Sequence, residues 1–436
     1  SGLLEHTGAA ASLTFTAVPF EHPLWVLYSS GTTGLPKGIV HGHGGMLTEH
    51  LKALSLQADL GPGERFIWYT TTGWMMWNFL VSGLLVGCTV VLYDGSPVHP
   101  DPGALWRLVE SEHISYFGTS AGYLQSCDKG GLRPADHYDL SRLRAIGSTG
   151  SPLSPATFDW ITEAVGPDVQ ICSISGGTDV CTAFLGSAPT VPVWRGEISC
   201  RALGAAAAAF DERGTAVIDA LGELVLTKPM PCMPVGLWGD TDGSRLFATY
   251  FGRYPGVWSH GDWVRFTSRG SCVLYGRSDA TLNRGGIRMG TAEFYRVIEG
   301  CEQVRDALVI SVGVTARADL TEPTEPNEPG SEDELVCCVV LAAGASLGAV
   351  EPQLRTMLRV QLSPRHVPDR FVAIDEVPVT LNGKKCEIPV KRILAGTPVE
   401  QAVSAASLRN PAALMQLCGA VRRSWSGGAE RQLPLA

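Results

Sequence analysis

Residues 28–38 combine small hydroxyl residues, glycines and one lysine in the order Tyr-Ser-Ser-Gly-Thr-Thr-Gly-Leu-Pro-Lys-Gly. The apolar residues 23–27 come directly before them and predict a short buried strand. Hydroxyl groups and glycine amides can surround phosphate oxygens, and Lys37 adds a mobile positive charge. A Walker A loop is excluded, because that pattern has Ser or Thr directly after its lysine and Lys37 is followed by Gly38. A phosphate-binding loop and a solvent-exposed turn both fit this composition.

Three further segments carry polar groups that suit nucleotide and metal chemistry. Thr178 and Asp179 could bind a phosphate and Mg²⁺, although a helix cap or a turn uses the same residue types. Asp262 could accept hydrogen bonds from two ribose hydroxyls, with Arg277 supporting the sugar or a phosphate. The same two residues could equally form a structural ion pair. Residues 147–152 form a Gly/Ser turn that could lie along a planar base or be a turn and nothing more.

Composition limits the class of partner. The 436 residues are 45% hydrophobic and 18% charged, with a net charge of −9. This predicts a globular protein of two or three domains, and an acidic chain without a Lys/Arg run is a poor candidate for binding nucleic acid or an anionic membrane. The longest apolar stretch, residues 79–93, is interrupted and too short for a membrane span. Twelve scattered cysteines without a C-x-x-C pair favour a reduced, cytoplasmic protein that lacks a structural zinc site.

Strand and helix candidates alternate through residues 65–173, which predicts an α/β architecture with parallel strands. From about Gly222 the segments become strand-like, with turns between them, and predict a β-rich subdomain. Further on, a compact α+β unit is expected, with strands over 304–314, 335–341 and 371–377 and helices over 287–300 and 350–362. We therefore expect a large domain (1–279), a small mobile C-terminal domain (280–395) and a helical tail (396–436).

Taken together, the motifs resemble those of the adenylate-forming superfamily of acyl-CoA synthetases, peptide-synthetase adenylation domains and luciferases. They are Tyr-Ser-Ser-Gly-Thr-Thr-Gly-Leu-Pro-Lys-Gly, Gly-Gly-Thr-Asp, His-Gly-Asp-Trp, Gly-Arg-Ser-Asp, Gly-Gly-Ile-Arg and Asn-Gly-Lys. The resemblance covers residues 22–395, and residues 228–235, 254–263 and 388–394 make the chain most similar to acetoacetyl-CoA synthetases. Relatives usually carry a substantial portion before the phosphate loop, and a chain that reaches this loop by residue 28 is expected to lack it.

The resemblance implies that a carboxylate attacks the α-phosphate of ATP, that pyrophosphate leaves, and that the acyl group then passes to the thiol of CoA. Such a reaction needs no protein nucleophile, so positioning and charge stabilisation supply the catalysis. Thr178 would contact the α-phosphate, and Asp179 would help to hold Mg²⁺ where most relatives have Glu. The residues implied for ATP and AMP are Ser29, Ser30, Gly31, Thr32, Thr33 and Lys37 at the β- and γ-phosphates, Gly150, Ser151 and Pro152 at the adenine, Asp262 and Arg277 at the ribose, Arg288 near phosphate, and Gly177 and Thr178.

Lys384 and Lys385 lie on a predicted turn, where a lysine is most often only solvated. The resemblance matches Lys384 with the family's catalytic lysine, which would bridge the carboxylate and the α-phosphate, although sequence alone leaves Lys385 as an alternative. Asp279 falls at the family's hinge. After adenylation, a swing about this hinge would withdraw Lys384 and bring Gly285 and Gly286 to the CoA tunnel.

The acyl pocket is predicted from size. Acetyl-CoA synthetases carry a Trp two residues before the threonine that matches Thr178, and this chain has Gly176 there. The missing indole would leave room for a longer acid such as acetoacetate, with Trp74 and Met75 on the opposite wall. The expected activity is ATP-dependent ligation of acetoacetate to CoA. The alternatives are a CoA ligase for another short acid and an inactive nucleotide-binding fragment.

Overall fold

The computed structural model describes residues 14–29, 37–278, 282–284, 287–313, 333–381 and 383–426, with the backbone alone for residues 283, 284, 287 and 288. None of the helices in these ranges has the length and hydropathy to cross a membrane. Several predicted site residues lie outside the described part of the chain: Ser30, Gly31, Thr32, Thr33, Asp279, Gly285 and Gly286, together with the side chain of Arg288.

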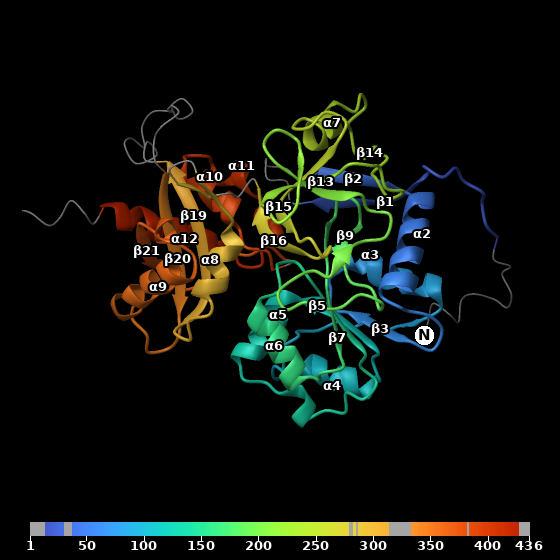
Figure 1. The fold of residues 1–436 in the computed structure, drawn as a ribbon, viewed down its shortest axis with the longest axis horizontal. Coiled ribbons are helices and arrows are strands. Elements are labelled where there is room, and N and C mark those ends of the chain that lie inside the picture. The colour runs from blue at the N-terminus through green and yellow to red at the C-terminus, as the bar shows by residue number, and fades with distance from the viewer. Residues whose placement is uncertain are drawn as a thin grey trace, which may run out of the picture.

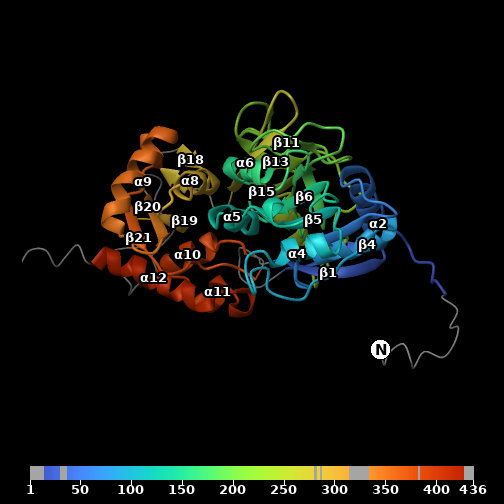
Figure 2. The ribbon, with the colours of Figure 1, turned by 90° about the horizontal axis from the view of Figure 1, so that it is seen from below.

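An all-parallel five-stranded sheet lies at the centre of the larger part of the molecule (Figures 1 and 2). Its strands, in spatial order, are β4 (Thr89–Val90), β3 (Arg65–Trp68), β5 (Tyr116–Ser120), β6 (Ala145–Thr149) and β7 (Gln170–Ser173). Successive side chains of a strand face opposite ways. Ile67 therefore packs in the cluster of α4 (Ala104–Ser111), α5 (Ala121–Lys129) and α6 (Pro155–Ala164), while Phe66 and Trp68 pack with α3 (Met76–Val81). The predicted parallel α/β architecture is confirmed.

Antiparallel sheets build the β-rich part. The largest has the order β12 (Ala216–Val217), β11 (Ala207–Phe210), β13 (Gly222–Leu226), β15 (Trp258–Phe266) and β16 (Cys272–Arg277). A second consists of β8 (Ser175–Gly177), β9 (Thr182–Gly186) and β10 (Cys200–Arg201), and a third of β1 (Pro23–Ser29), β2 (Lys37–Gly42) and β14 (Gly236–Leu237). Helices α2 (His43–Lys52) and α7 (Ser244–Tyr250) adjoin them, and one hydrophobic cluster connects residues from all three sheets.

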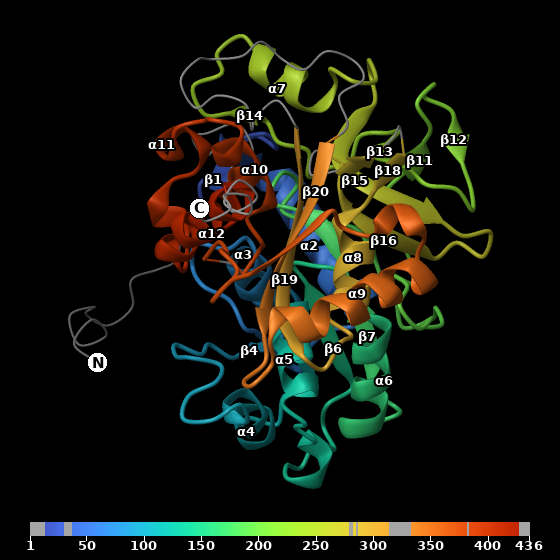
Figure 3. The same cartoon turned by 90° about the vertical axis from the view of Figure 1, so that its left-hand side faces the viewer.

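The small C-terminal part is an α+β unit beside the larger part (Figure 1). Strand β20 (Asp333–Leu341) lies between antiparallel β19 (Val304–Gly313) and parallel β21 (Arg370–Ala373). Helices α8 (Thr291–Ile298) and α9 (Leu347–Gln361) cover one face, and α10 (Glu387–Leu394) and α12 (Pro411–Ser426) cover the other (Figure 3). Helix α12 thus shares a core with the small sheet, beside the short helix α11 (Val399–Ala402). The domain boundaries stay a prediction.

Three predicted elements differ from those observed. The helix expected over 287–300 begins at Thr291, because Ile287–Met289 pairs as β18 with β17 (Leu282–Arg284). The mostly apolar residues 88–93, one of the strand candidates in the alternating stretch 65–173, contain only the two-residue strand β4. Helix α5 has no counterpart among the predicted elements, although Ser120 caps it by accepting a hydrogen bond from the Tyr123 amide at 3.2 Å.

Candidate active site

Thr178 and Asp179 lie in the four-residue turn that joins β8 to β9. The Tyr250 hydroxyl, at the end of α7, donates a hydrogen bond to Asp179 Oδ1. Burial acts to raise the pKa of Asp179, but His260, the Tyr250 hydrogen bond and the positive charge of Lys37 together bring it below its ordinary value. Asp179 is therefore ionised at neutral pH and suited to a cation.

Lys37, near the end of the predicted phosphate loop and the first residue of β2, interacts electrostatically with the same carboxylate. Its ammonium lies 5.3 Å from the centre of the Tyr250 ring, and that ring stacks on Trp258 with centroids 3.6 Å apart. Across the β1–β2 pair from Lys37, the Ser29 hydroxyl is buried and has no hydrogen-bond partner among the described residues. A phosphate oxygen would satisfy it, so this corner of the site fits the predicted ligand.

Asp262 and Arg277 are directly opposite each other in the β15–β16 pair. Arg277 Nη1 is 3.9 Å from Asp262 Oδ1, too far for a hydrogen bond, and donates to the His260 carbonyl oxygen at 3.1 Å. Gly261 leaves room for the guanidinium, since a Cβ there would lie 2.7 Å from Arg277 Nη2. Such a loose pairing leaves the Asp262 carboxylate able to accept sugar hydroxyls.

Lys384 reaches this site from the small C-terminal part. It interacts electrostatically with Arg277, Asp262 and Asp179. Desolvation and then the charge of Arg277 lower its pKa, against the opposing effect of the two carboxylates. The residue as a whole is nevertheless exposed.

A tight turn presents Lys384. Gly383 has φ +77°, and the Lys384 amide donates to Thr380 Oγ1 at 3.1 Å. The base of the turn is fixed by Asn410, which accepts from the Val379 amide at 2.9 Å. These hydrogen bonds all lie within the small C-terminal part, and they fix the backbone at Lys384.

Lys385 points the other way, into the small domain. Its ammonium bonds to Glu299, to Asp306 Oδ1 at 2.6 Å and to the Ala307 carbonyl oxygen at 2.6 Å, and it lies 4.0 Å from the centre of the Tyr295 ring. Burial acts to lower the pKa of Lys385, but the two carboxylates raise it above its ordinary value. The geometry therefore favours Lys384 over Lys385 as the lysine that meets a substrate.

The residues predicted to bind the adenine and those predicted to line the acyl pocket lie close together just after the end of β6. Gly150 has φ +95°, and a Cβ there would lie 4.0 Å from Trp74 Cζ2. Ser151 and Pro152 follow at this edge and are exposed, whereas Trp74 is buried and Met75 packs against two hydrophobic clusters. The predicted adenine turn and acyl wall are thus adjacent.

Gly176 does not open space in the way expected. A Cβ at this position would lie 1.9 Å from the Thr182 carbonyl oxygen and 2.5 Å from Ala183 Cα. The direction of its side chain is filled by the β9 backbone. A larger side chain would first have to displace β9. The glycine therefore allows the two strands of the hairpin to approach closely, and it does not simply leave empty space in a pocket.

Two residues without a predicted role lie at the centre of the site. His260 Nε2 is 3.5 Å from Asp262 Oδ2, and a Cβ at Gly177 would lie 2.9 Å from His260 Cε1. Its Nδ1 is buried and has no partner among the described residues. The second residue, Tyr250, carries no signal in the sequence, whereas His260 stands in the His-Gly-Asp-Trp motif.

Within the described ranges there is no cluster of three or more His, Cys, Asp or Glu side chains that could hold a metal ion. A single carboxylate is nevertheless enough for Mg²⁺ when substrate phosphates and water complete its shell. Asp179, whose carboxylate interacts with the positive charge of Lys37, fits this arrangement.

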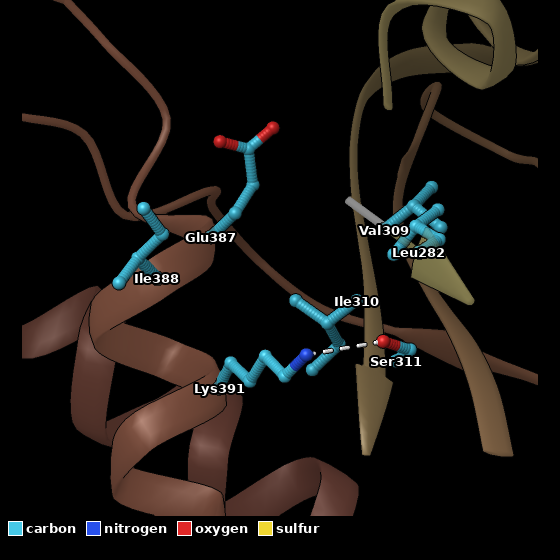
Figure 4. A pocket seen from close by; sticks show the side chains of 7 residues that line it. All are labelled: Leu282, Val309, Ile310, Ser311, Glu387, Ile388 and Lys391. Atoms are coloured by element: carbon cyan, nitrogen blue, oxygen red, sulfur yellow. Dashed lines mark hydrogen bonds between the residues drawn. The ribbon is translucent and has the colours of Figure 1, made fainter. Parts of the chain in front are cut away.

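A small pocket in the C-terminal part contains none of the predicted site residues (Figure 4). Lys391 and Ser311 face each other in it, with Nζ and Oγ 3.3 Å apart. Glu387, also in its lining, accepts a hydrogen bond from the Tyr295 hydroxyl at 2.8 Å. The pocket therefore borders the internal network that holds Lys385.

Comparison with known proteins identifies the family. The profile described as "AMP-binding enzyme" matches residues 5–233. The chain belongs to the AMP-binding enzyme family. Among the curated members it resembles, acetoacetyl-coenzyme A synthetase of Rhizobium meliloti (strain 1021) is 44% identical over 411 residues, which are 94% of this chain and 60% of that protein. Acetoacetyl-CoA synthetase of Gallus gallus is 41% identical over 393 residues, 90% of this chain and 57% of that protein.

Solved structures agree with this family assignment. Acetoacetyl-CoA synthetase from Streptomyces lividans matches with a TM-score of 0.86 and 49% identity, covering 97% of this AMP-binding chain and 62% of that one. The anthranilate CoA ligase AuaEII, crystallised with anthranoyl-AMP, shares the fold with a TM-score of 0.71 at 20% identity. The chain thus spans about 60% of the length of the relatives it matches.

Proposed function

We propose that this chain carries out the adenylation and thioester chemistry of an acetoacetate–CoA ligase that forms AMP and pyrophosphate. The observation that carries the proposal is the convergence of Lys384 with Asp179, Asp262 and Arg277, which come from parts of the chain far apart in sequence. The names of the most similar relatives supply the acid, acetoacetate. ATP and CoA are the co-substrates in this proposal.

Each charged group has a distinct task in the first half-reaction. Lys384 would neutralise the substrate carboxylate and the α-phosphate, so that two anions can meet. Thr178 would bond the α-phosphate, and Asp262 with Arg277 would fix the ribose. Lys37 and Ser29 would take the departing phosphates. Asp179 would hold Mg²⁺, which when bound neutralises phosphate charge.

The remaining assignments extend this scheme to residues outside the described ranges. Ser30, Gly31, Thr32, Thr33 and Arg288 would complete the phosphate site. Asp279 would be the hinge about which residues 280–395 swing away from residues 1–279, and Gly285 and Gly286 would then meet CoA. We also assign the protein to the cytoplasm, since all twelve cysteines are free thiols, which suits a reducing compartment.

Acid-dependent exchange of pyrophosphate into ATP tests the proposal directly. Acetoacetate should support exchange better than acetate, 3-hydroxybutyrate or a branched short acid. Lys384→Ala should abolish exchange, while thioester formation from a supplied acyl-adenylate continues, because the lysine acts only where the carboxylate meets the α-phosphate. Lys385→Ala is the matched variant and should lower thermal stability.

Three outcomes would contradict parts of this scheme. Equal loss of both half-reactions in Lys384→Ala would contradict the role of that lysine. Preference for another acid in the panel would replace acetoacetate as the substrate. Nucleotide binding without exchange by the wild-type chain would indicate a nucleotide-binding module instead.

A further inference from the structure

The turn that carries Thr178 and Asp179 is held from behind by the β2–α2 segment. Nε2 of His41, on β2, bonds to the Thr178 carbonyl oxygen at 3.0 Å. Nε2 of His50, on α2, bonds to the Cys181 carbonyl oxygen at 2.8 Å. The neighbouring Glu49 accepts a hydrogen bond from Thr182 Oγ1 at 2.9 Å, so contacts are made at both ends of the turn.

The two histidine rings act as fixed donors. Burial lowers the pKa of both, that of His41 to about 4, so each ring is neutral near pH 7 and has a single N–H. A carbonyl oxygen can only accept, which places that hydrogen on Nε2 in both rings. His50 Nδ1 is then left as an acceptor beside the Ser82 hydroxyl at 2.7 Å, whose single hydrogen also has the Asn78 carbonyl oxygen within reach at 2.8 Å.

The turn needs such external support. Cys181 has φ +51°, a left-handed conformation that is unfavourable for a residue with a Cβ. The bonds inside the turn are long, with 3.3 Å from the Val180 amide to the Gly177 oxygen and 3.3 Å from the Cys181 amide to the Thr178 oxygen. The hydrogen bonds to His41 and His50 are shorter, and they therefore help to stabilise this backbone conformation.

We propose that His41 and His50 are positioning residues that hold the Thr178–Asp179 turn in its active geometry. Their segment starts directly after the predicted phosphate loop, so the same bonds tie that loop's exit strand to the metal-binding turn. The consequence for catalysis rests on the proposed function. The holding of the turn itself is a property of the ligand-free chain and is tested separately.

Amide hydrogen exchange of residues 178–182 is the direct measurement. His50→Phe keeps an aromatic ring beside Phe79 and Trp25 but removes the donor. It should speed exchange in this turn about tenfold, the effect of losing one buried hydrogen bond. His50→Gln keeps a donor at a similar reach and should remain within about threefold of wild type. Trp106→Phe, in the separate α4 cluster, controls for general destabilisation.

Kinetics supply the second measurement. In the exchange assay, His50→Phe should raise KM for MgATP about tenfold, leave thioester formation from supplied acyl-adenylate unchanged, and be rescued by His50→Gln. Unchanged amide exchange in His50→Phe, or equal acceleration of the turn by Trp106→Phe, would overturn the inference. If wild type shows no acid-dependent exchange, the proposed function fails, while the amide measurement still decides the role of His50.

Discussion

Lys384 combines two requirements that oppose each other. The proposed reaction needs a cation where two anions meet, yet desolvation and the neighbouring Arg277 both disfavour the protonated amine of Lys384 and lower its pKa. Asp179 and Asp262 act in the other direction without cancelling the effect. The lysine is therefore a charge that a bound anion would stabilise, which suits a group that works on the transition state.

The first prediction concerns pH. Since the protonated lysine is the working form, activity should be complete below the lowered pKa of Lys384 and be lost as the pH rises through it. The alkaline limb of kcat/KM for the acid should therefore lie below the ordinary lysine pKa of about 10.4. Arginine stays protonated in this range, so the residual activity of Lys384→Arg should lack that limb. An identical limb in both proteins would refute the assignment.

The sequence predicts which types of residue carry the chemistry, but it does not always distinguish between two adjacent candidates. The resemblance matches Lys384 with the family's catalytic lysine, but the sequence alone leaves Lys385, on the same predicted turn, as an alternative. They are distinguished by Glu299 and Asp306, which lie 86 and 79 residues away along the chain and hold Lys385 inside the small domain. Tyr250 was not predicted for the same reason, because its contact with Asp179 exists only in the folded chain.

The β8–β9 hairpin determines in which direction a side chain at position 176 would point. Gly176 was predicted to leave room for a longer acid, which treats the side-chain position as pointing into a pocket. Its Cβ direction instead meets the β9 backbone at the Thr182 carbonyl oxygen. Periodicity can predict a strand, but the face to which one glycine points depends on register, and this pairing has a shift between Ser175 and Gly176.

The second prediction follows from that geometry. Gly176→Ala should reduce exchange with acetoacetate and with acetate alike, about tenfold or more, because a methyl group 1.9 Å from a carbonyl oxygen forces the hairpin and its Thr178–Asp179 turn to move. Parallel acid titrations in the exchange assay would measure this. Gly236→Ala, on strand β14, has no atom within 4 Å of its Cβ and is the matched control. If Gly176→Ala kept full activity and preferred acetate, the prediction that Gly176 leaves room for a longer acid would be supported instead.

For the whole molecule, the position of the small domain decides whether Lys384 is in the site. Gln125, on α5 of the larger part, donates from Nε2 to Glu299 Oε2 at 2.9 Å, and Lys129 donates to the Arg305 carbonyl oxygen at 3.1 Å. Glu299 is the same carboxylate that holds Lys385, the neighbour of Lys384. One network therefore joins the larger part to the chain segment that presents Lys384. Sequence patterns predicted two domains but could not show this contact, since its partners are 174 residues apart.

The last prediction is that this contact favours adenylation over thioester formation. Gln125→Glu would place a second carboxylate against Glu299, replacing a hydrogen bond worth about 1 kcal/mol with repulsion, and should slow pyrophosphate exchange about fivefold or more. Thioester formation from supplied acyl-adenylate should be unchanged or faster, because the proposed swing of the small C-terminal part would break the contact before that step. Ser126→Asp adds the same charge at an exposed position of α5, where the native hydroxyl donates to the Tyr123 carbonyl oxygen, and should leave both rates near wild type. Equal effects of the two variants would show that the added negative charge alone slows exchange. If Gln125→Glu slowed both half-reactions, the contact would support the fold in general and not one orientation of the two parts.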